Sequence, residues 1–147
     1  MSTARPEEQR AACDRVIRVA LEGMRDPWVV RETWRTVRDA TTRRDIIVAV
    51  TRRVLEVPYA PDAPGGDPIQ PVRATLEGVP CDCEDRTAAV CAMLLTCDIA
   101  AAAAYVSVPS ASIDHMASAA RYGAVWVWAD ATPPGMIGGS LSWPTSY

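Results

Sequence analysis

The sequence predicts an α+β fold, in which N-terminal helices precede one buried central helix that packs on a small antiparallel sheet. Three observations lead to this prediction. Apolar residues recur every three or four positions through the first 56 residues. Residues 87–97 are apolar on every side, which is typical of a helix buried all round. The segments on either side of Tyr122-Gly123 have the character of hairpin strands.

Three helices are expected in the first 56 residues, where they form a scaffold. Asp26 before Pro27 predicts an N-cap followed by proline at the first helical position. Thr42 with Asp45 three residues later predicts a capping box. Trp34 is expected to anchor the packing of the second helix. The inward positions would be Cys13, Val16, Ile17, Ala20, Leu21 and Met24, then Val30, Trp34 and Val37, then Ile46, Ile47, Val50 and Val54.

Residues 57–80 differ in composition from the helical segments. They hold six of the 12 prolines together with Gly65-Gly66, and this composition excludes a regular helix. A connection this long is often a functional lid or a partner-binding segment, and the alternative is an extended wrap along the surface.

Strands are expected at 101–108, 114–121 and 124–130, with a hairpin turn at Tyr122-Gly123. We expect one of Trp126 and Trp128 to lie in the core and the other to lie beside the site. The 147 residues suit a single domain. Its parts would be a helical scaffold at 1–56, a proline-rich connecting loop at 57–80, and a helix and sheet at 81–147.

Charge is spread unevenly along the chain. Residues 1–56 hold 12 arginines and 9 acids, whereas residues 57–147 hold 3 arginines and 9 acids, and the chain has no lysine. The acidic second part argues against a nucleic-acid groove there and mildly favours a cationic substrate or partner. No run of about 18 apolar residues predicts a membrane span. The polar N-terminus does not resemble a signal peptide, so a cytoplasmic protein with reduced cysteines is expected.

Cys83 is the candidate nucleophile, because it lies at the start of the buried helix. Asp82 and Asp85 resemble a capping box, which places Cys83 in the first helical turn. The helix terminus could lower the pKa of the thiol from about 8.5 to about 7. Since Asp82, Glu84 and Asp85 act in the opposite direction, a cationic imidazole beside the sulfur would be needed to hold a thiolate.

His115 and Asp130 are the candidate base and orienting carboxylate. His115 is the only histidine of the chain, and Asp130 follows it by 15 residues. With a hairpin turn at Tyr122-Gly123, the two would lie nearly opposite each other on paired strands, about 5 Å apart. Packing of this hairpin against the start of the Cys83 helix would assemble a nucleophile, a base and an orienting group.

The residues around Cys83 resemble the transglutaminase-like superfamily, and most closely its short members from tailed bacteriophages and prophages. Those members carry a Gly-Asp-Cys-Asp-Asp-Lys/Arg stretch at the start of the helix, which residues 81–86 match with Cys81 in place of glycine. The resemblance extends over residues 25–140 and is most specific at the cysteine stretch. Its other matching segments are Arg25-Asp26-Pro27, Tyr59-Ala60-Pro61-Asp62, Ile69-Gln70-Pro71 and Trp128-Ala129-Asp130-Ala131-Thr132.

The resemblance implies a papain-like, transglutaminase-like core with Cys83 as nucleophile, His115 as base and Asp130 as third member. It implies thiol-dependent acyl transfer or hydrolysis at amide bonds. No cofactor is expected, and at this size, without a calcium-loop motif, no metal requirement is expected either. The backbone N–H of Cys83 is one candidate for polarising the substrate carbonyl, and Gln70 is a weaker one. Asp98 stands where a glycine usually ends the helix, and aspartate tolerates the left-handed conformation required there.

Other interpretations of the same residues stay open. Cys83 could be an ordinary buried thiol. Cys81, Cys83 and His115 could ligate zinc, with a fourth ligand from Cys13, Cys91 or Cys97, although Cys-x-Cys is a weak zinc pattern. The acids beside Cys83 could hold a hard cation, but capping already explains two of them.

Two functions from different classes are therefore expected. One is an acyl-transfer enzyme acting on a peptide or protein amide. The other is a structural or adaptor protein of a phage particle, in the cytoplasm or the virion, that keeps the fold with little or no activity. In that case residues 57–80 and 138–147 would contact phage head or tail proteins. Neither nucleic acid nor a membrane is an expected partner.

Overall fold

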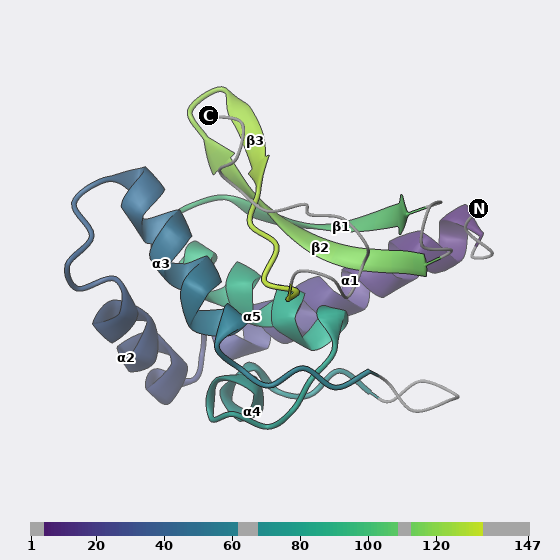
Figure 1. Cartoon of the computed structure of the whole chain (residues 1–147), viewed down its shortest axis with the longest axis horizontal. Coiled ribbons are helices and arrows are strands. Elements are labelled where there is room, and N and C mark those ends of the chain that lie inside the picture. Colours follow the sequence, from purple (N-terminus) through teal and green to yellow (C-terminus); the bar gives the residue numbers. More distant parts are fainter. Residues whose placement is uncertain (1–4, 62–67, 109–112, 134–147) are drawn as a thin grey trace.

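The computed structural model of the chain describes residues 5–61, 68–108 and 113–133. This part of the chain has an α+β fold, as predicted, with helices on a small antiparallel sheet (Figure 1). The elements are α1 (Pro6–Gly23), α2 (Pro27–Thr36), α3 (Arg43–Leu55), α4 (Val72–Leu76), α5 (Cys83–Thr96), β1 (Ala101–Val108), β2 (Ile113–Tyr122) and β3 (Val125–Trp128).

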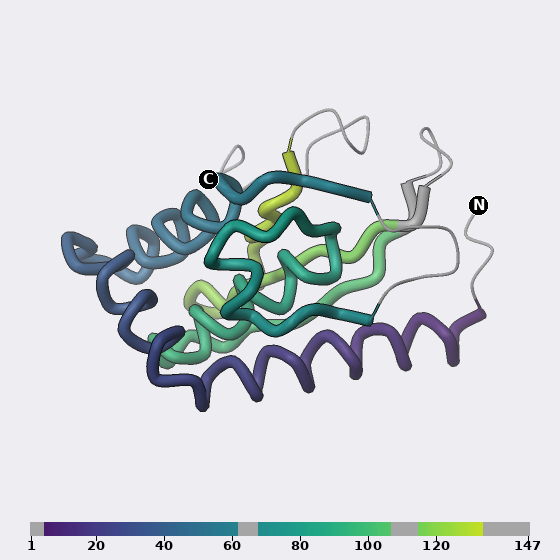
Figure 2. Tube along the Cα trace, turned by 90° about the horizontal axis from the view of Figure 1, so that it is seen from below, coloured from purple at the N-terminus to yellow at the C-terminus, as the bar shows by residue number. Residues whose placement is uncertain are grey.

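Helix α5 is the centre of the molecule (Figure 1). It contacts the other four described helices as well as β1 and β2. Every residue from Asp85 to Leu94 is buried, which confirms the prediction of a helix buried on all sides. Helix α1 lies along one side of the molecule, as the view in Figure 2 makes clear. Within the described residues, no helix combines enough length and apolar character to cross a membrane.

The predicted helix starts are confirmed. The Asp26 carboxylate accepts a hydrogen bond from Trp28 N at 2.9 Å, and Pro27 is the first residue of α2. The Thr42 hydroxyl accepts from Asp45 N at 3.1 Å. Such bonds satisfy backbone donors that have no acceptor within the helix.

The inward face of α2 differs from the prediction. Val29 and Thr33 are buried instead of Val30 and Trp34, and the Trp34 side chain is 53% exposed. The Thr33 hydroxyl can be buried because it donates to Val29 O at 2.8 Å. Glu32 is also buried beside Arg53. Leu21 of α1, also expected inside, is 49% exposed.

The second part of the chain brings two further corrections. Residues 57–80 are not loop throughout, because the short helix α4 forms within them. Trp126 and Trp128 are both exposed, at 47% and 37%, since residues two apart on a strand point to the same side. Between them only Val127 is turned into the core.

The sheet has the order β1-β2-β3, and both pairings are antiparallel. Tyr122 lies opposite Val125, so the hairpin turns at residues 123 and 124, one residue later than expected. Gly123 has a φ of 63°, which a glycine adopts without steric cost. Asp98 has a φ of 61° after the end of α5, as the left-handed conformation predicted there requires.

Candidate active site

Cys83 is the first residue of α5, and the predicted capping box in front of it is present. Asp82 Oδ1 accepts from Asp85 N at 3.1 Å, and Asp85 Oδ2 accepts from Asp82 N at 3.2 Å. At the first helical position the Cys83 N–H has no acceptor within the helix. This end of α5 therefore presents both the thiol and a backbone donor.

His115 and Asp130 form a buried pair. His115 Nε2 lies 2.9 Å from Asp130 Oδ2, and the two residues are only 2% and 8% exposed. A carboxylate can only accept, so this bond assigns the proton to Nε2 and leaves Nδ1 as the basic nitrogen of the neutral ring. Asp130 Oδ1 accepts from Thr132 N at 3.1 Å, which fixes the carboxylate.

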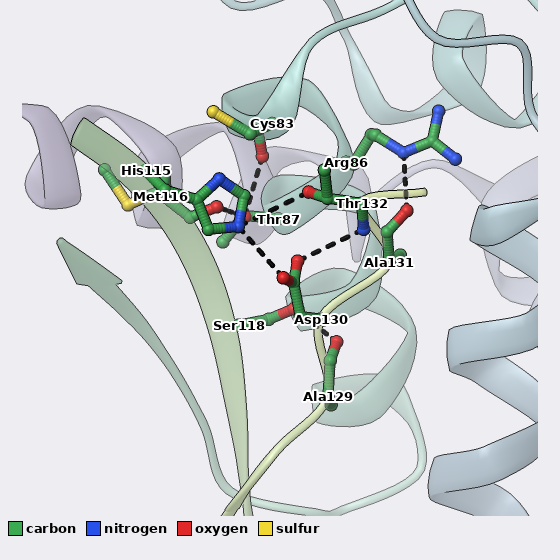
Figure 3. Close-up of polar contacts among 10 residues, drawn as sticks. All are labelled: Cys83, Arg86, Thr87, His115, Met116, Ser118, Ala129, Asp130, Ala131 and Thr132. Carbon is green, nitrogen blue, oxygen red and sulfur yellow. Dashed lines mark hydrogen bonds and ion pairs between the residues drawn. The ribbon is translucent and has the colours of Figure 1, made fainter. Parts of the chain in front are cut away.

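The pair forms by a different route from the predicted one. Strand β3 ends at Trp128, which lies opposite Ala119, and Ala129 N still donates to Ser118 O at 2.8 Å. After that residue the chain leaves the ladder, and Asp130 reaches back to His115 (Figure 3). The two residues are thus joined by a bend after β3 and not by facing positions on paired strands.

Cys83 lies beside the element that carries His115. Thr87 Oγ1 lies 2.7 Å from Cys83 O and 3.3 Å from the carbonyl oxygen of Met116, the residue after His115, so the start of α5 lies next to this part of β2. The Met116 backbone lowers the pKa of the Cys83 thiol. In Figure 3 the imidazole turns Nε2 toward Asp130 and Nδ1 toward Cys83. Among the described residues no hydrogen bond joins the Cys83 sulfur directly to the imidazole.

Cys83 is a thiol in the resting structure. Burial raises its pKa to about 12, and the charges of Asp82, Glu84 and Asp130 act in the same direction, whereas the Met116 backbone opposes them. The positive end of α5 does not offset these effects. This agrees with the sequence argument that the helix terminus alone cannot hold a thiolate beside three acids.

No ion pair joins Arg86 to the acids around Cys83 in the described part of the chain. Its guanidinium is buried, donates to backbone carbonyls and to the sulfur of Cys81, and lies over the Tyr59 ring. The accepting oxygens belong to Val54, Leu55, Val57, Pro58 and Ala131, at 2.9, 3.1, 2.7, 3.4 and 2.7 Å respectively.

 The shortest of these bonds, at 2.7 Å each, run from Nη1 to Val57 O and from Nε to Ala131 O.

The other residues considered for chemistry lie away from Cys83 or are already bonded. The Cys81 sulfur is buried against Arg86 Nη1 at 3.7 Å. Gln70 Nε2 donates to Thr75 Oγ1 at 2.9 Å and to Val79 O at 3.3 Å, so its amide is not free to polarise a substrate. Within 5–61, 68–108 and 113–133, no three potential ligand side chains are grouped to hold a metal ion, which counts against the zinc and hard-cation interpretations.

Three hydroxyl residues around the site were given no role from the sequence, although Thr132 ends one of the matching segments. The Thr87 hydroxyl lies between Cys83 O and Met116 O, and the Ser118 hydroxyl donates to Ala129 O at 2.7 Å. Thr132 Oγ1 is 3.4 Å from His115 Nε2. Small polar residues that are buried must find partners. A polar residue at the edge of a predicted core element is the signal that could have indicated them.

Asp85 is expected to make the protein more stable in mild acid than at neutral pH. Burial, followed by a hydrogen bond with Asp82, raises the pKa of the Asp85 carboxyl to about 7. The folded chain then keeps a proton that the unfolded chain releases at about pH 4. The free energy of unfolding should therefore fall by up to about 4 kcal/mol as the pH rises from about 4 to about 7.

Urea unfolding of the wild type and of Asp85→Asn across this interval measures the effect. The amide mimics the protonated carboxyl, so the variant should lose most of the pH dependence. Asp98→Asn, which removes an exposed carboxylate just after α5, is the control and should keep the wild-type pH dependence. Equal pH dependence in Asp85→Asn and the wild type would contradict the prediction.

The chain was also compared with known proteins. No family model, no curated protein and no solved structure matches it, so the transglutaminase-like resemblance depends on the residues quoted above.

Proposed function

We propose that this protein is a thiol-dependent enzyme of acyl transfer or hydrolysis at amide bonds, with a papain-like, transglutaminase-like core. One observation carries the proposal. His115 Nε2 is held by Asp130 at 2.9 Å, while Thr87 Oγ1, 2.7 Å from Cys83 O and 3.3 Å from Met116 O, holds the start of α5 beside the residue after His115. We interpret Cys83, His115 and Asp130 as the nucleophile, the base and the orienting group of a catalytic triad.

The chemistry follows from the protonation states. His115 Nδ1 takes the proton of the Cys83 thiol as the sulfur attacks the carbonyl carbon of an amide. The imidazolium then gives that proton to the leaving amine, the C–N bond breaks, and a thioester remains on Cys83. Water releases an acid from this thioester, and an amine releases a new amide. Asp130 stabilises the imidazolium in both steps.

The Cys83 N–H is the best-supported donor to the oxyanion. It belongs to the first turn of α5, where backbone N–H groups lack intrahelical acceptors and the helix dipole favours negative charge. An oxyanion formed on the carbonyl attacked by Cys83 would lie close to this group. The second candidate from the sequence, Gln70, is already bonded to Thr75 and Val79.

Alkylation across a range of pH tests the proposal. The protein is treated with iodoacetamide, and the labelled cysteines are mapped by mass spectrometry. Cys83 should be labelled faster than Cys97, a partly buried thiol after α5 that serves as the internal reference. Because His115 takes the proton as the sulfur reacts, the labelling of Cys83 should already be fast well below the pKa of about 12 to which burial raises the thiol. Labelling of Cys83 no faster than that of Cys97 would contradict the proposal.

One observation favours a second function, that of a phage structural or adaptor protein. Burial raises the pKa of Cys83 to about 12, as expected for a thiol that no longer reacts. The exposed Trp126 and Trp128 of β3 would then be available for protein contacts. Co-purification with virions or tail complexes, together with slow alkylation of Cys83, is the outcome that supports this function over the enzyme.

A further inference from the structure

Three separate segments carry the three proposed catalytic residues. Cys83 begins α5, His115 lies on β2, and Asp130 lies in residues 129–132, after β3. We propose that Arg86, Thr87 and Ser118 are positioning residues that join these segments in pairs and close them into a ring. This inference rests on the proposed function, and it assigns a role to three side chains that do not react.

Thr87 joins α5 to β2. Its Oγ1 is 2.7 Å from Cys83 O and 3.3 Å from Met116 O, so one hydroxyl hydrogen is shared between two carbonyls. One acceptor belongs to the proposed nucleophile and the other to the residue after the proposed base. The hydroxyl therefore sets the separation of the two backbones at the point where a proton must pass from sulfur to imidazole.

Ser118 joins β2 to residues 129–132. Its Oγ donates to Ala129 O at 2.7 Å, while Ala129 N donates to Ser118 O at 2.8 Å. The second bond continues the ladder beyond β3, and the first adds a side-chain contact to the same residue. Because Asp130 comes next, these two bonds fix the place from which its carboxylate reaches His115.

Arg86 closes the ring between residues 129–132 and α5. Its Nε donates to Ala131 O at 2.7 Å, on the other side of Asp130 from Ala129. All three positioning side chains are buried, so water does not compete for their bonds. Figure 3 shows how these side chains surround the imidazole: Thr87 bonds to the backbone of Cys83 and of Met116, Ser118 to that of Ala129, and Arg86 to that of Ala131.

The ring matters because proton transfer depends steeply on geometry. A displacement of about 1 Å at reacting groups can lower a rate by about 100-fold. One hydroxyl–carbonyl hydrogen bond contributes only about 1 kcal/mol, which corresponds to a smaller loss of rate. We therefore expect the loss of the Thr87 hydroxyl to lower the alkylation rate of Cys83 by about fivefold to tenfold. Its loss should leave the His115–Asp130 contact, which lies on the other side of the ring, unchanged.

Thr87→Val is the main test, because valine keeps the shape of the side chain and removes the hydroxyl. Thr87→Ser keeps the hydroxyl and should restore the alkylation rate of Cys83 to within about twofold of the wild type. Thr96→Val is the matched control. Thr96 also lies in α5 and donates to the carbonyl four residues earlier, Ala92 O at 2.7 Å, but it has no described acceptor on another segment.

The single histidine provides a second readout that needs no reactive thiol. Its imidazole nitrogen resonances in NMR report the Nε2–Asp130 bond directly. Ser118→Ala should shift these resonances, whereas Thr96→Val should not. Thermal unfolding of each variant confirms that measurements are made on folded protein.

The outcomes separate the two proposals. Slow alkylation of Cys83 in the wild type contradicts the proposed function. The imidazole nitrogen resonances of the Ser118→Ala variant still test the ring in that case. The ring is wrong if Thr87→Val and Thr96→Val alkylate alike, if Thr87→Ser fails to restore the rate, or if Ser118→Ala leaves the imidazole resonances unchanged.

Discussion

Replacing Arg86 by methionine is expected to lower the free energy of unfolding by about 4 kcal/mol. The buried guanidinium donates to carbonyls of three regions: the last turn of α3, residues 57 and 58, and Ala131. Methionine fills similar space but donates no hydrogen bond. Val54 O and Pro58 O still accept from Val57 N and Cys81 N, so the oxygens of Leu55, Val57 and Ala131 are the ones that lose a described donor. Each buried carbonyl that loses its partner costs about 1–3 kcal/mol.

Urea unfolding measures this effect. Arg86→Lys keeps the charge but offers three donors on a flexible stem in place of a planar fork with five, so an intermediate loss of about 2 kcal/mol is expected. The control is Arg73→Met on the surface. Arg73 pairs with Glu77 at 2.6 Å and lies over the Trp28 ring, and its loss should cost less than about 1 kcal/mol. Equal losses in the two methionine variants would show that the buried bonds do not stabilise the fold.

Replacing His115 by alanine is expected to slow the reaction of Cys83 by at least about 100-fold at neutral pH. The pKa of the Cys83 thiol is raised to about 12, chiefly by burial, so almost no thiolate forms without a base. The loss should shrink as the pH is raised toward that value, because hydroxide then removes the proton. Alkylation rates of the wild type and His115→Ala across pH measure this convergence.

Asp130→Asn separates orientation from basicity. The amide keeps the size of the side chain but removes the carboxylate that fixes the proton on Nε2, so Nδ1 is no longer held as the base. A loss of about 100-fold is expected, close to that of His115→Ala. The control is Asp98→Asn, which removes a carboxylate far from the imidazole in the chain. Wild-type rates in His115→Ala would exclude the imidazole as the base of Cys83.

The elements of the fold could be predicted where local rules decide them. The caps at Asp26, Thr42 and Asp82 satisfy nearby backbone donors, and the apolar surface of α5 needs burial on every side, so both could be predicted from the sequence. The inward face of α2 could not, because Thr33 is buried only through a bond to Val29 O that no apolar pattern indicates. The hairpin turn was misplaced by one residue because Gly123 fits either position.

The sequence predicts that His115 and Asp130 lie together, but it does not predict the path of the chain that brings them into contact. Cys83 at the start of α5 follows from its cap. The contact of His115 with Asp130 depends on the chain leaving the ladder after Trp128, a bend that strand periodicity does not contain. The role of Arg86 depends on carbonyls of α3 and of Ala131, which are 30 or more positions away from it in the chain. No local sequence pattern indicates such contacts.

The central place of α5 has a consequence for hydrogen exchange. A helix covered by four other helices and two strands can release its amide hydrogens only when most of the structure opens. The amides of residues 85–94 are therefore expected to exchange only when the molecule unfolds as a whole. The proposed nucleophile begins this helix, so its backbone is attached to the part of the protein that is expected to open last.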